Sequence, residues 1–304
     1  MMRMRKMARV LLLVGVACMV GCGSKEQAPA DAGKPKVIAS FYPMYIMARN
    51  VMKDVPGVSL ASLAPSAAGC LHDYAITTDD MKRLSKADVL ITNGAGMESF
   101  VDKVAARFPR LKIVPLAEGI PLIKGRGEEG DNPHVWVSIS NAIVEVRNLG
   151  KAMEQLDPPH AGIYRANTDA YAAKLDALRT RMKAELAPFA GSKIITLHEA
   201  FPYFAQEFGL EIAAVVQREP GSEPSAKELA ETIDLVRKAR IKALFGEPQY
   251  SSGAADAIAR ETGAKVYVLD PAVTGPDDPD AYVRIMDKNL DVLSKALKGT
   301  AEEN

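Results

Sequence analysis

Short apolar runs rich in β-branched residues alternate with amphipathic segments from about residue 35 to the end of the chain. Eight of these runs have the length and composition of strands, four in each half of the sequence. They are Val37–Ala39, Val58–Leu63, Val89–Thr92, Lys112–Pro115, Lys193–Leu197, Glu211–Val216, Lys242–Phe245 and Lys265–Leu269. Strands that alternate with helices predict parallel sheets covered by helices. We therefore expect an α/β protein with two lobes, each a mostly parallel four-stranded sheet flanked by helices.

Size and composition agree with a globular protein of this kind. A chain of 304 residues is near the limit of a single core, so one large or two medium domains are expected. With 48% hydrophobic and 25% charged residues, the composition excludes a disordered, collagen-like or disulfide-rich chain. Its 38 basic and 38 acidic residues balance, and no basic stripe indicates nucleic-acid binding.

The segment between the two halves has the clearest helical pattern. Asp157 followed by Pro158 is a favourable helix start, and the pattern ends near Pro188. An apolar stripe recurs with helical period at Tyr164, Tyr171, Leu175, Leu178, Met182 and Leu186. A helix of about 30 residues is about 45 Å long, enough to run along both lobes and leave a cleft between them. We assign 36–156 to the N-terminal lobe, 157–188 to a rigid linking helix and 189–304 to the C-terminal lobe; a coiled-coil helix is a weaker alternative, with fewer than five heptads.

The first residues form an export signal. A basic segment (Arg3, Arg5, Lys6 and Arg9) precedes an apolar run that ends before Gly21 and Cys22, too short to span a membrane. The ending resembles a bacterial lipobox, so residues 1–21 are expected to be removed as a signal peptide and Cys22 to receive lipid. Cys18 is the alternative lipid site, and a simple cleaved signal is another. Residues 22–35 then form a polar tether, and the lipid holds the exported chain on the outer face of a bacterial membrane.

Three of the four histidines and one aspartate occupy the ends of predicted strands or the loops that follow them. His198 and Asp270 directly follow strands, whereas His72 and His134 lie in loops after the second and fourth strands. In open α/β sheets, ligands bind at the carboxyl ends of the strands. Separations of 62, 64 and 72 residues place two of these side chains on each lobe. The fourth histidine, His160, is expected to be structural.

Three imidazoles and one carboxylate form a tetrahedral set that suits Zn²⁺ and is acceptable to other first-row metals. Four protein ligands close the coordination sphere, which suits capture of an ion better than hydrolysis. Each histidine taken alone is equally compatible with a structural role.

Seven local strings, taken together, resemble the metal-binding lipoproteins that supply zinc, manganese or iron to ABC importers. The resemblance spans about residues 36–298. The strings begin at His72-Asp73-Tyr74, Asn93-Gly94-Ala95-Gly96-Met97-Glu98, Pro133-His134-Val135-Trp136, His198-Glu199-Ala200-Phe201, Glu223-Pro224-Ser225, Glu247-Pro248-Gln249 and Leu269-Asp270-Pro271.

This resemblance implies two α/β lobes joined by a long helix, with a metal site in the interlobe cleft. Its ligands fall on His72, His134, His198 and Asp270. The histidine at the third place is similar to the zinc-type branch, and nitrogen-rich sites favour Zn²⁺ over Mn²⁺, although Mn²⁺ and Fe²⁺ stay open.

Two features depart from the zinc-type pattern. Residues 125–131 contain no histidine, so a metal-collecting loop is not expected. Cys70 lies two residues before His72, and we expect a free or partly buried thiol there, because adjacent loop side chains seldom both reach one ion. Glu199 and Glu247 are candidates for orienting a ligand imidazole by accepting its second N–H.

The sequence thus predicts an extracytoplasmic, lipid-anchored, monomeric solute-binding protein that captures Zn²⁺ and delivers it to an ABC permease, with modest motion on binding. Two alternatives remain at this point. One is a zinc hydrolase with an open coordination position and Glu199 as base; the other is a surface adhesin stabilised by metal.

Overall fold

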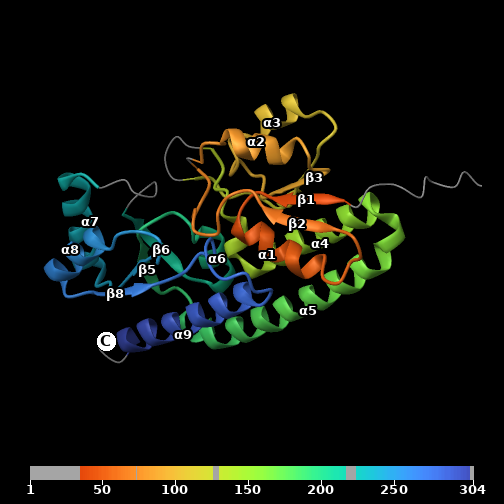
Figure 1. Cartoon of the computed structure of the whole chain (residues 1–304). Helices are drawn as coiled ribbons and strands as arrows, with labels where there is room; N and C mark the ends of the chain where they lie inside the picture. Colours follow the sequence, from red (N-terminus) through yellow and green to blue (C-terminus); the bar gives the residue numbers. More distant parts are fainter. Residues whose placement is uncertain (1–34, 73, 126–129, 217–223, 302–304) are drawn as a thin grey trace, which may run out of the picture. The chain divides into compact units, whose positions relative to one another are not determined.

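The structure is a computed structural model that describes residues 35–72, 74–125, 130–216 and 224–301, all of which belong to one compact unit (Figure 1). The predicted signal peptide, Cys22 and the tether up to residue 34 lie outside the described residues. Among the helices of the described part, none is long and apolar enough to cross a membrane.

The N-terminal lobe is built on a parallel sheet with the strand order β2-β1-β3-β4. Its strands are β1 (Lys36–Ala39), β2 (Ser59–Ser62), β3 (Val89–Thr92) and β4 (Lys112–Pro115). The helices between them are α1 (Tyr42–Val51), α2 (Thr78–Leu84) and α3 (Val101–Arg107). All four residues of β3 are buried, as expected for an apolar run inside a parallel sheet.

The C-terminal lobe repeats this topology, with the parallel order β6-β5-β7-β8. Its strands are β5 (Lys193–Thr196), β6 (Glu211–Val215), β7 (Ala243–Gly246) and β8 (Lys265–Val268). Its helices are α6 (Pro202–Phe208), α7 (Ala226–Ala239) and α8 (Gly253–Thr262). The α/β prediction is confirmed, and each of the eight strands was predicted to within one residue at either end.

Three longer helices complete the fold. The helix α4 (Ile139–Leu156) packs against α5 (Ala161–Leu186), and α5 also contacts α1 and α9 (Ala281–Ala301). In Figure 1, α5 and α9 run side by side beneath both sheets. Every residue of the apolar stripe predicted for the linking helix is buried in α5.

The predicted start of the linking helix was wrong in detail. Asp157 ends α4, a short 3₁₀ turn (Pro158–His160) follows, and α5 begins only at Ala161. The Asp157 side chain does not cap a helix, because it accepts a hydrogen bond from Tyr164 (2.9 Å) and faces Nδ1 of His160 (2.8 Å). With 26 residues, α5 is about 39 Å long, shorter than the predicted helix.

Two hydrophobic clusters lie on opposite faces of the C-terminal sheet. On β5, Ile194 joins the main cluster, which also contains the core of the N-terminal lobe, while Ile195 joins a smaller cluster with Val236 and Ile258. Successive strand residues point to opposite faces of a sheet, so β5 contributes side chains to both clusters. The main cluster is therefore continuous from one lobe to the other.

Candidate metal centre

The predicted ligands lie at the carboxyl ends of strands or in the loops beyond them. His72 lies in the loop between β2 and α2, and His134 precedes a 3₁₀ turn (Val135–Val137) after β4. His198 and Asp270 each lie two residues beyond the last residue of their strands, β5 and β8. The βα topology thus places these four side chains at or beyond the carboxyl ends of the strands of the two sheets.

The three imidazoles meet between the lobes. The Nε2 atoms of His72 and His134 are 3.1 Å apart, and the His198 ring centroid lies 4.8 Å from that of His134 and 5.9 Å from that of His72. His134 and His198 are each only 2% exposed. A neutral imidazole is the form that binds a metal, and burial disfavours the charged form of His134.

Asn132 determines how His134 presents its ring. The Asn132 Oδ1 accepts a hydrogen bond from the His134 backbone N–H (3.0 Å) and lies 3.1 Å from its Nδ1. A proton on Nδ1 satisfies this contact and leaves the lone pair of Nε2 directed at His72. Burial lowers the pKa of His134 well below its ordinary value of 6.5, and the neighbouring His198 and His72 lower it further.

Glu247 faces the Nδ1 atom of His198. Its Oε1 lies 3.2 Å from Nδ1 of His198, and both side chains are almost fully buried. The pair lacks the alignment of a hydrogen bond, and neither Nδ1 nor the two Glu247 oxygens has another hydrogen-bond partner among the described residues. A carboxylate in this place is suited to hold a proton on Nδ1 and leave Nε2 free for an ion.

Glu199, the other glutamate considered, lies at 9% exposure beside the site. Its backbone carbonyl accepts a hydrogen bond from the Asn132 side chain (2.8 Å). Through this contact the loop after β5 is joined to the residue that orients His134.

Asp270 is held at the same edge by its own set of contacts. Its backbone N–H donates to Asn289 on α9 (2.9 Å), and its Oδ1 accepts from the backbone of Ala272 (2.8 Å) and from Gln249 (3.5 Å). The indole N–H of Trp136 donates to the carbonyl of the next residue, Pro271 (2.8 Å), which links the Asp270 loop to the His134 turn. Burial raises the pKa of the Asp270 carboxyl above its ordinary value, although the contacts from Ala272 and Gln249 oppose the shift.

Cys70 lies closer to the histidines than expected. Among the described residues, one group of three potential ligands has donor atoms that all lie within 4.8 Å of one another, and it consists of Cys70, His72 and His134. Cys70 is a free cysteine of intermediate exposure. His198 and Asp270 do not belong to this tightest group.

The sequence analysis gave no role to Asn132, and it quoted Asn93 and Glu98 only as parts of one string of the family resemblance. Asn93 donates through its side chain to the carbonyl of Pro133 (3.0 Å), while its backbone N–H donates to Glu98 (2.7 Å). Glu98 also accepts from Gly94 and Ser40. The signal was present as an asparagine two residues before a candidate ligand, followed by proline, which is a common turn pattern.

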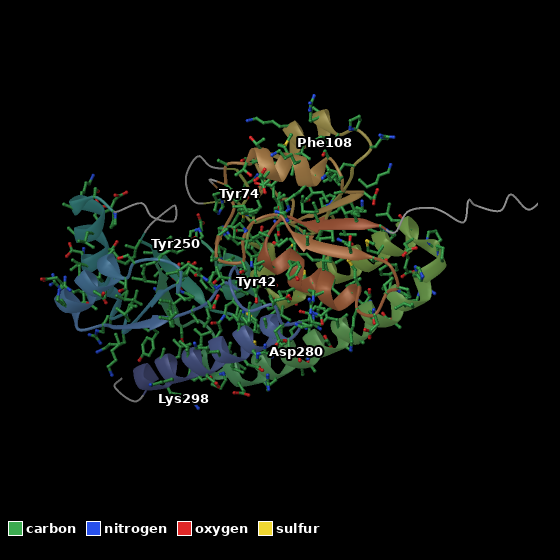
Figure 2. The ribbon with its side chains drawn as sticks, in the orientation of Figure 1. Tyr42, Tyr74, Phe108, Tyr250, Asp280 and Lys298 are labelled. Carbon is green, nitrogen blue, oxygen red and sulfur yellow. The ribbon has the colours of Figure 1, made fainter. Side chains whose placement is uncertain are left out.

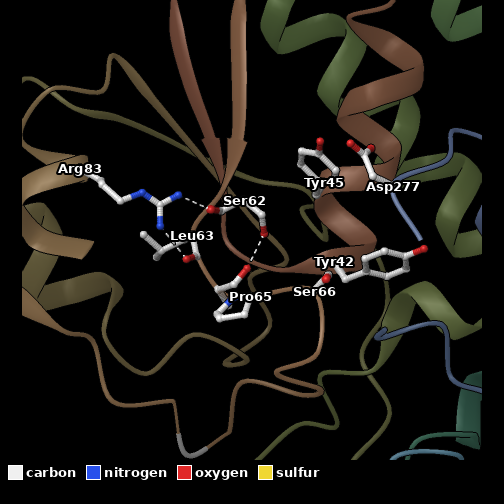
Figure 3. A pocket seen from close by; sticks show the side chains of 9 residues that line it. Tyr42, Tyr45, Ser62, Leu63, Pro65, Ser66, Arg83 and Asp277 are labelled. Carbon is white, nitrogen blue, oxygen red and sulfur yellow. Dashed lines mark hydrogen bonds between the residues drawn. The ribbon is translucent and has the colours of Figure 1, made fainter. Parts of the chain in front are cut away.

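A separate cavity of about 360 Å³ lies beside α1, and none of the predicted ligands lines it (Figure 3). Its arginine, Arg83, already donates to the backbone carbonyls of Leu63 (2.9 Å) and Ser62. Among the described residues, the group whose donor atoms are close enough to hold a metal is the one formed by Cys70, His72 and His134.

Residues 37–296 match the family described as the periplasmic component A of the zinc-uptake complex, ZnuA. The chain belongs to this family. It is 31% identical to the high-affinity zinc uptake system protein ZnuA of Bacillus subtilis, over 94% of this chain and 97% of that protein. It is 30% identical to the zinc-binding lipoprotein AdcA of Streptococcus pneumoniae over 98% of this chain, which spans only 62% of that longer relative.

Among solved structures, the solute-binding protein FpvC of Pseudomonas aeruginosa in complex with Mn²⁺ is similar, with a TM-score of 0.80 and 30% identity over 88% of this chain and 99% of that one. The two-lobed fold and the kinship with metal-uptake components inferred from the sequence are confirmed.

Proposed function

We propose that the protein is an exported solute-binding component that captures Zn²⁺ between its lobes and delivers it to an ABC permease. His72, His134, His198 and Asp270 are the proposed ligands. The observation that carries the proposal is the meeting of three imidazoles from both lobes, two of them buried, with 3.1 Å between the Nε2 atoms of His72 and His134. Nitrogen-rich sites favour Zn²⁺ over Mn²⁺, in agreement with the zinc-uptake relatives.

Asn132 and Glu247 are the proposed positioning residues. Each faces the Nδ1 atom of a ligand histidine, so each favours the tautomer whose Nε2 accepts a metal. Asp270 is proposed to bind through Oδ2, because Oδ1 is already engaged by Ala272 and Gln249. Four protein ligands leave no coordination position for a water nucleophile, and the family is one of transport components, which argues against the hydrolase alternative.

A competitive Zn²⁺ titration of metal-free protein tests this proposal. We expect one tightly bound ion per chain, and we expect His134→Ala to weaken binding by at least about 100-fold, because removing a residue that only orients a ligand already costs 10- to 100-fold. The matched control is His160→Ala, since His160 contacts Asp157 outside the site. Absence of stoichiometric zinc, or equal binding by the two variants, contradicts the ligand assignment.

Lipid attachment at Cys22 is proposed from the signal sequence and from a relative that is named a lipoprotein. We expect Cys22→Ser to abolish incorporation of radiolabelled palmitate and to release the protein from the membrane fraction. Cys18→Ser is the control and should still be labelled. Labelling lost with Cys18→Ser instead moves the lipid to Cys18.

The adhesin alternative stays a sequence-based prediction. It differs from the transport proposal in predicting that the metal-free protein unfolds. A transport component has to remain folded when its cargo leaves. We expect the circular dichroism of the chelator-treated protein to retain its helical signal, whereas unfolding on metal removal supports a structural metal.

A further inference from the structure

Cys70 sits in the loop that presents His72, and its position is fixed by contacts from the other lobe. The phenol of Tyr250, from the loop after β7, lies against the Cys70 thiol. A Cβ placed on the preceding residue, Gly69, meets the Tyr250 hydroxyl at 3.4 Å, and Gly69 has a φ of +74°. Figure 2 shows Tyr250 between the C-terminal lobe and the loops of the N-terminal lobe. The thiol is thus held at the junction of the lobes.

The distances around Cys70 are close to those of a coordination sphere. In a tetrahedral zinc site, bond lengths of about 2.3 Å to sulfur and about 2.0 Å to nitrogen place donor atoms about 3.3 to 3.6 Å apart. The two Nε2 atoms of His72 and His134 are 3.1 Å apart, and the sulfur of Cys70 lies within 4.8 Å of its two partners. Side-chain movements of about 1 Å bring the three atoms into tetrahedral range.

His198 provides a second, independent indication of a ligand at this place. It is 2% exposed, its ring lies against those of His72 and His134, and its Nδ1 faces Glu247, which leaves Nε2 for an ion. A histidine buried in this way beside two others has the surroundings of a metal ligand.

Asp270 is the less available of the two candidates for the fourth position. Its Oδ1 is already engaged by Ala272 and Gln249, and its carboxylate is not part of the tightest donor group. A thiolate and a carboxylate also differ in the ions they prefer, since sulfur selects soft metals and oxygen selects hard ones.

We propose that Cys70 is a direct metal ligand that replaces Asp270 as the fourth donor for strongly thiophilic ions such as Cd²⁺, so that the same histidine cluster holds these ions and Mn²⁺ through different fourth donors. This inference rests on the proposed function of the histidine cluster. Binding releases the thiol proton to solvent as the metal–sulfur bond forms. Asp270 remains the fourth donor for Zn²⁺ and for harder ions such as Mn²⁺.

Cadmium binding tests the proposal directly. The full chain carrying Cys18→Ser and Cys22→Ser retains Cys70 as its one thiol, and Cd²⁺ added to it should give an ultraviolet thiolate-to-cadmium charge-transfer band. Cys70→Ser in this background should remove the charge-transfer band. Circular dichroism establishes that the variant is folded, and Cys70→Ala provides a second variant without an oxygen donor.

Metal competition tests the selectivity. We expect Cys70→Ser to weaken Cd²⁺ binding by about tenfold or more and to leave Mn²⁺ binding within about twofold, whereas Asp270→Asn should have the opposite preference. Stoichiometric Cd²⁺ binding without a charge-transfer band, or unchanged Cd²⁺ binding by Cys70→Ser, overturns the role of Cys70 and leaves the proposed function intact. If the parent chain binds no stoichiometric metal, the proposed function fails and this inference fails with it.

Discussion

Asn132 uses its polar groups to connect the metal centre to its surroundings. Besides its contacts with His134 and Glu199, its backbone carbonyl accepts from Tyr203 (2.7 Å) and its backbone N–H donates to Ile123 (2.8 Å). The Asn132 side chain thus orients the His134 ring and also links the His134 loop to Glu199 in the C-terminal lobe.

Substitution of Asn132 should weaken metal binding while every proposed ligand is retained. We expect Asn132→Ala to lower Zn²⁺ affinity by about 10- to 100-fold, because the His134 tautomer is no longer held. Asn167→Ala is the control, since Asn167 donates to the carbonyls of Val51 and Lys53, away from the site. Isothermal titration of both variants should separate them; equal affinities would contradict the role of Asn132.

The depressed pKa of His134 makes the metal-free protein sensitive to acid. Because the pKa of His134 is lower in the folded chain than in the unfolded chain, the unfolded state binds more protons below pH 6.5, and the free energy of unfolding decreases as the pH falls. We expect His134→Gln to lose less of this free energy than the parent between pH 7 and pH 5. Urea unfolding at several pH values measures this, and equal slopes would place the acid sensitivity elsewhere.

At the scale of single elements, the strands could be predicted from the sequence, whereas the pairing of α4 with α5 could not. The inner strands β3 and β7 are short apolar runs that their sheets bury whole, whereas the edge strands are only partly buried. The helix α4 was not singled out, although its buried residues Ile139, Ala142, Val146, Leu149 and Met153 recur at helical spacing. Its packing against α5 is a tertiary contact that no local pattern reveals.

The contact between α4 and α5 leaves no room for a side chain at Gly150. A Cβ there lies 2.8 Å from Cγ2 and 2.9 Å from Cβ of Thr168 on α5. We expect Gly150→Ala to destabilise the protein by about 1 to 3 kcal/mol, because overpacking outweighs the gain in helix propensity. Gly162→Ala on α5 meets nothing within 4 Å and should instead stabilise by roughly 0.5 to 1 kcal/mol. Chemical denaturation of the pair checks both signs.

At the scale of the whole described unit, the site residues could be chosen from the sequence, but their distances could not. The ends of strands, read with the family resemblance, pointed to His72, His134, His198 and Asp270. The proximity of Cys70 depends on Tyr250 and on the left-handed backbone of Gly69, which are features of the folded loops. A local pattern carries no information about contacts of that kind.

The continuous main core limits the motion that accompanies binding. Residues from both sheets belong to one hydrophobic cluster, and α5 contacts α1, α4 and α9. Opening the lobes widely would expose this apolar surface to water, at about 25 cal/mol for each Å². We expect solution scattering to give the same radius of gyration with and without Zn²⁺. A clear contraction on metal addition would show that the lobes hinge.

The smaller hydrophobic cluster, which packs against α7 and α8, makes local unfolding easier in this part of the molecule than in the main core. Of the residues of α7, Val236 is the buried one, whereas α4 and α5 each bury at least seven. Amide protons of α7 should therefore exchange with deuterium early, through local openings that leave the main core intact. The amides of α4 and α5 should be among the last to exchange. The helices next to the His134 turn therefore stay folded during most local openings of α7.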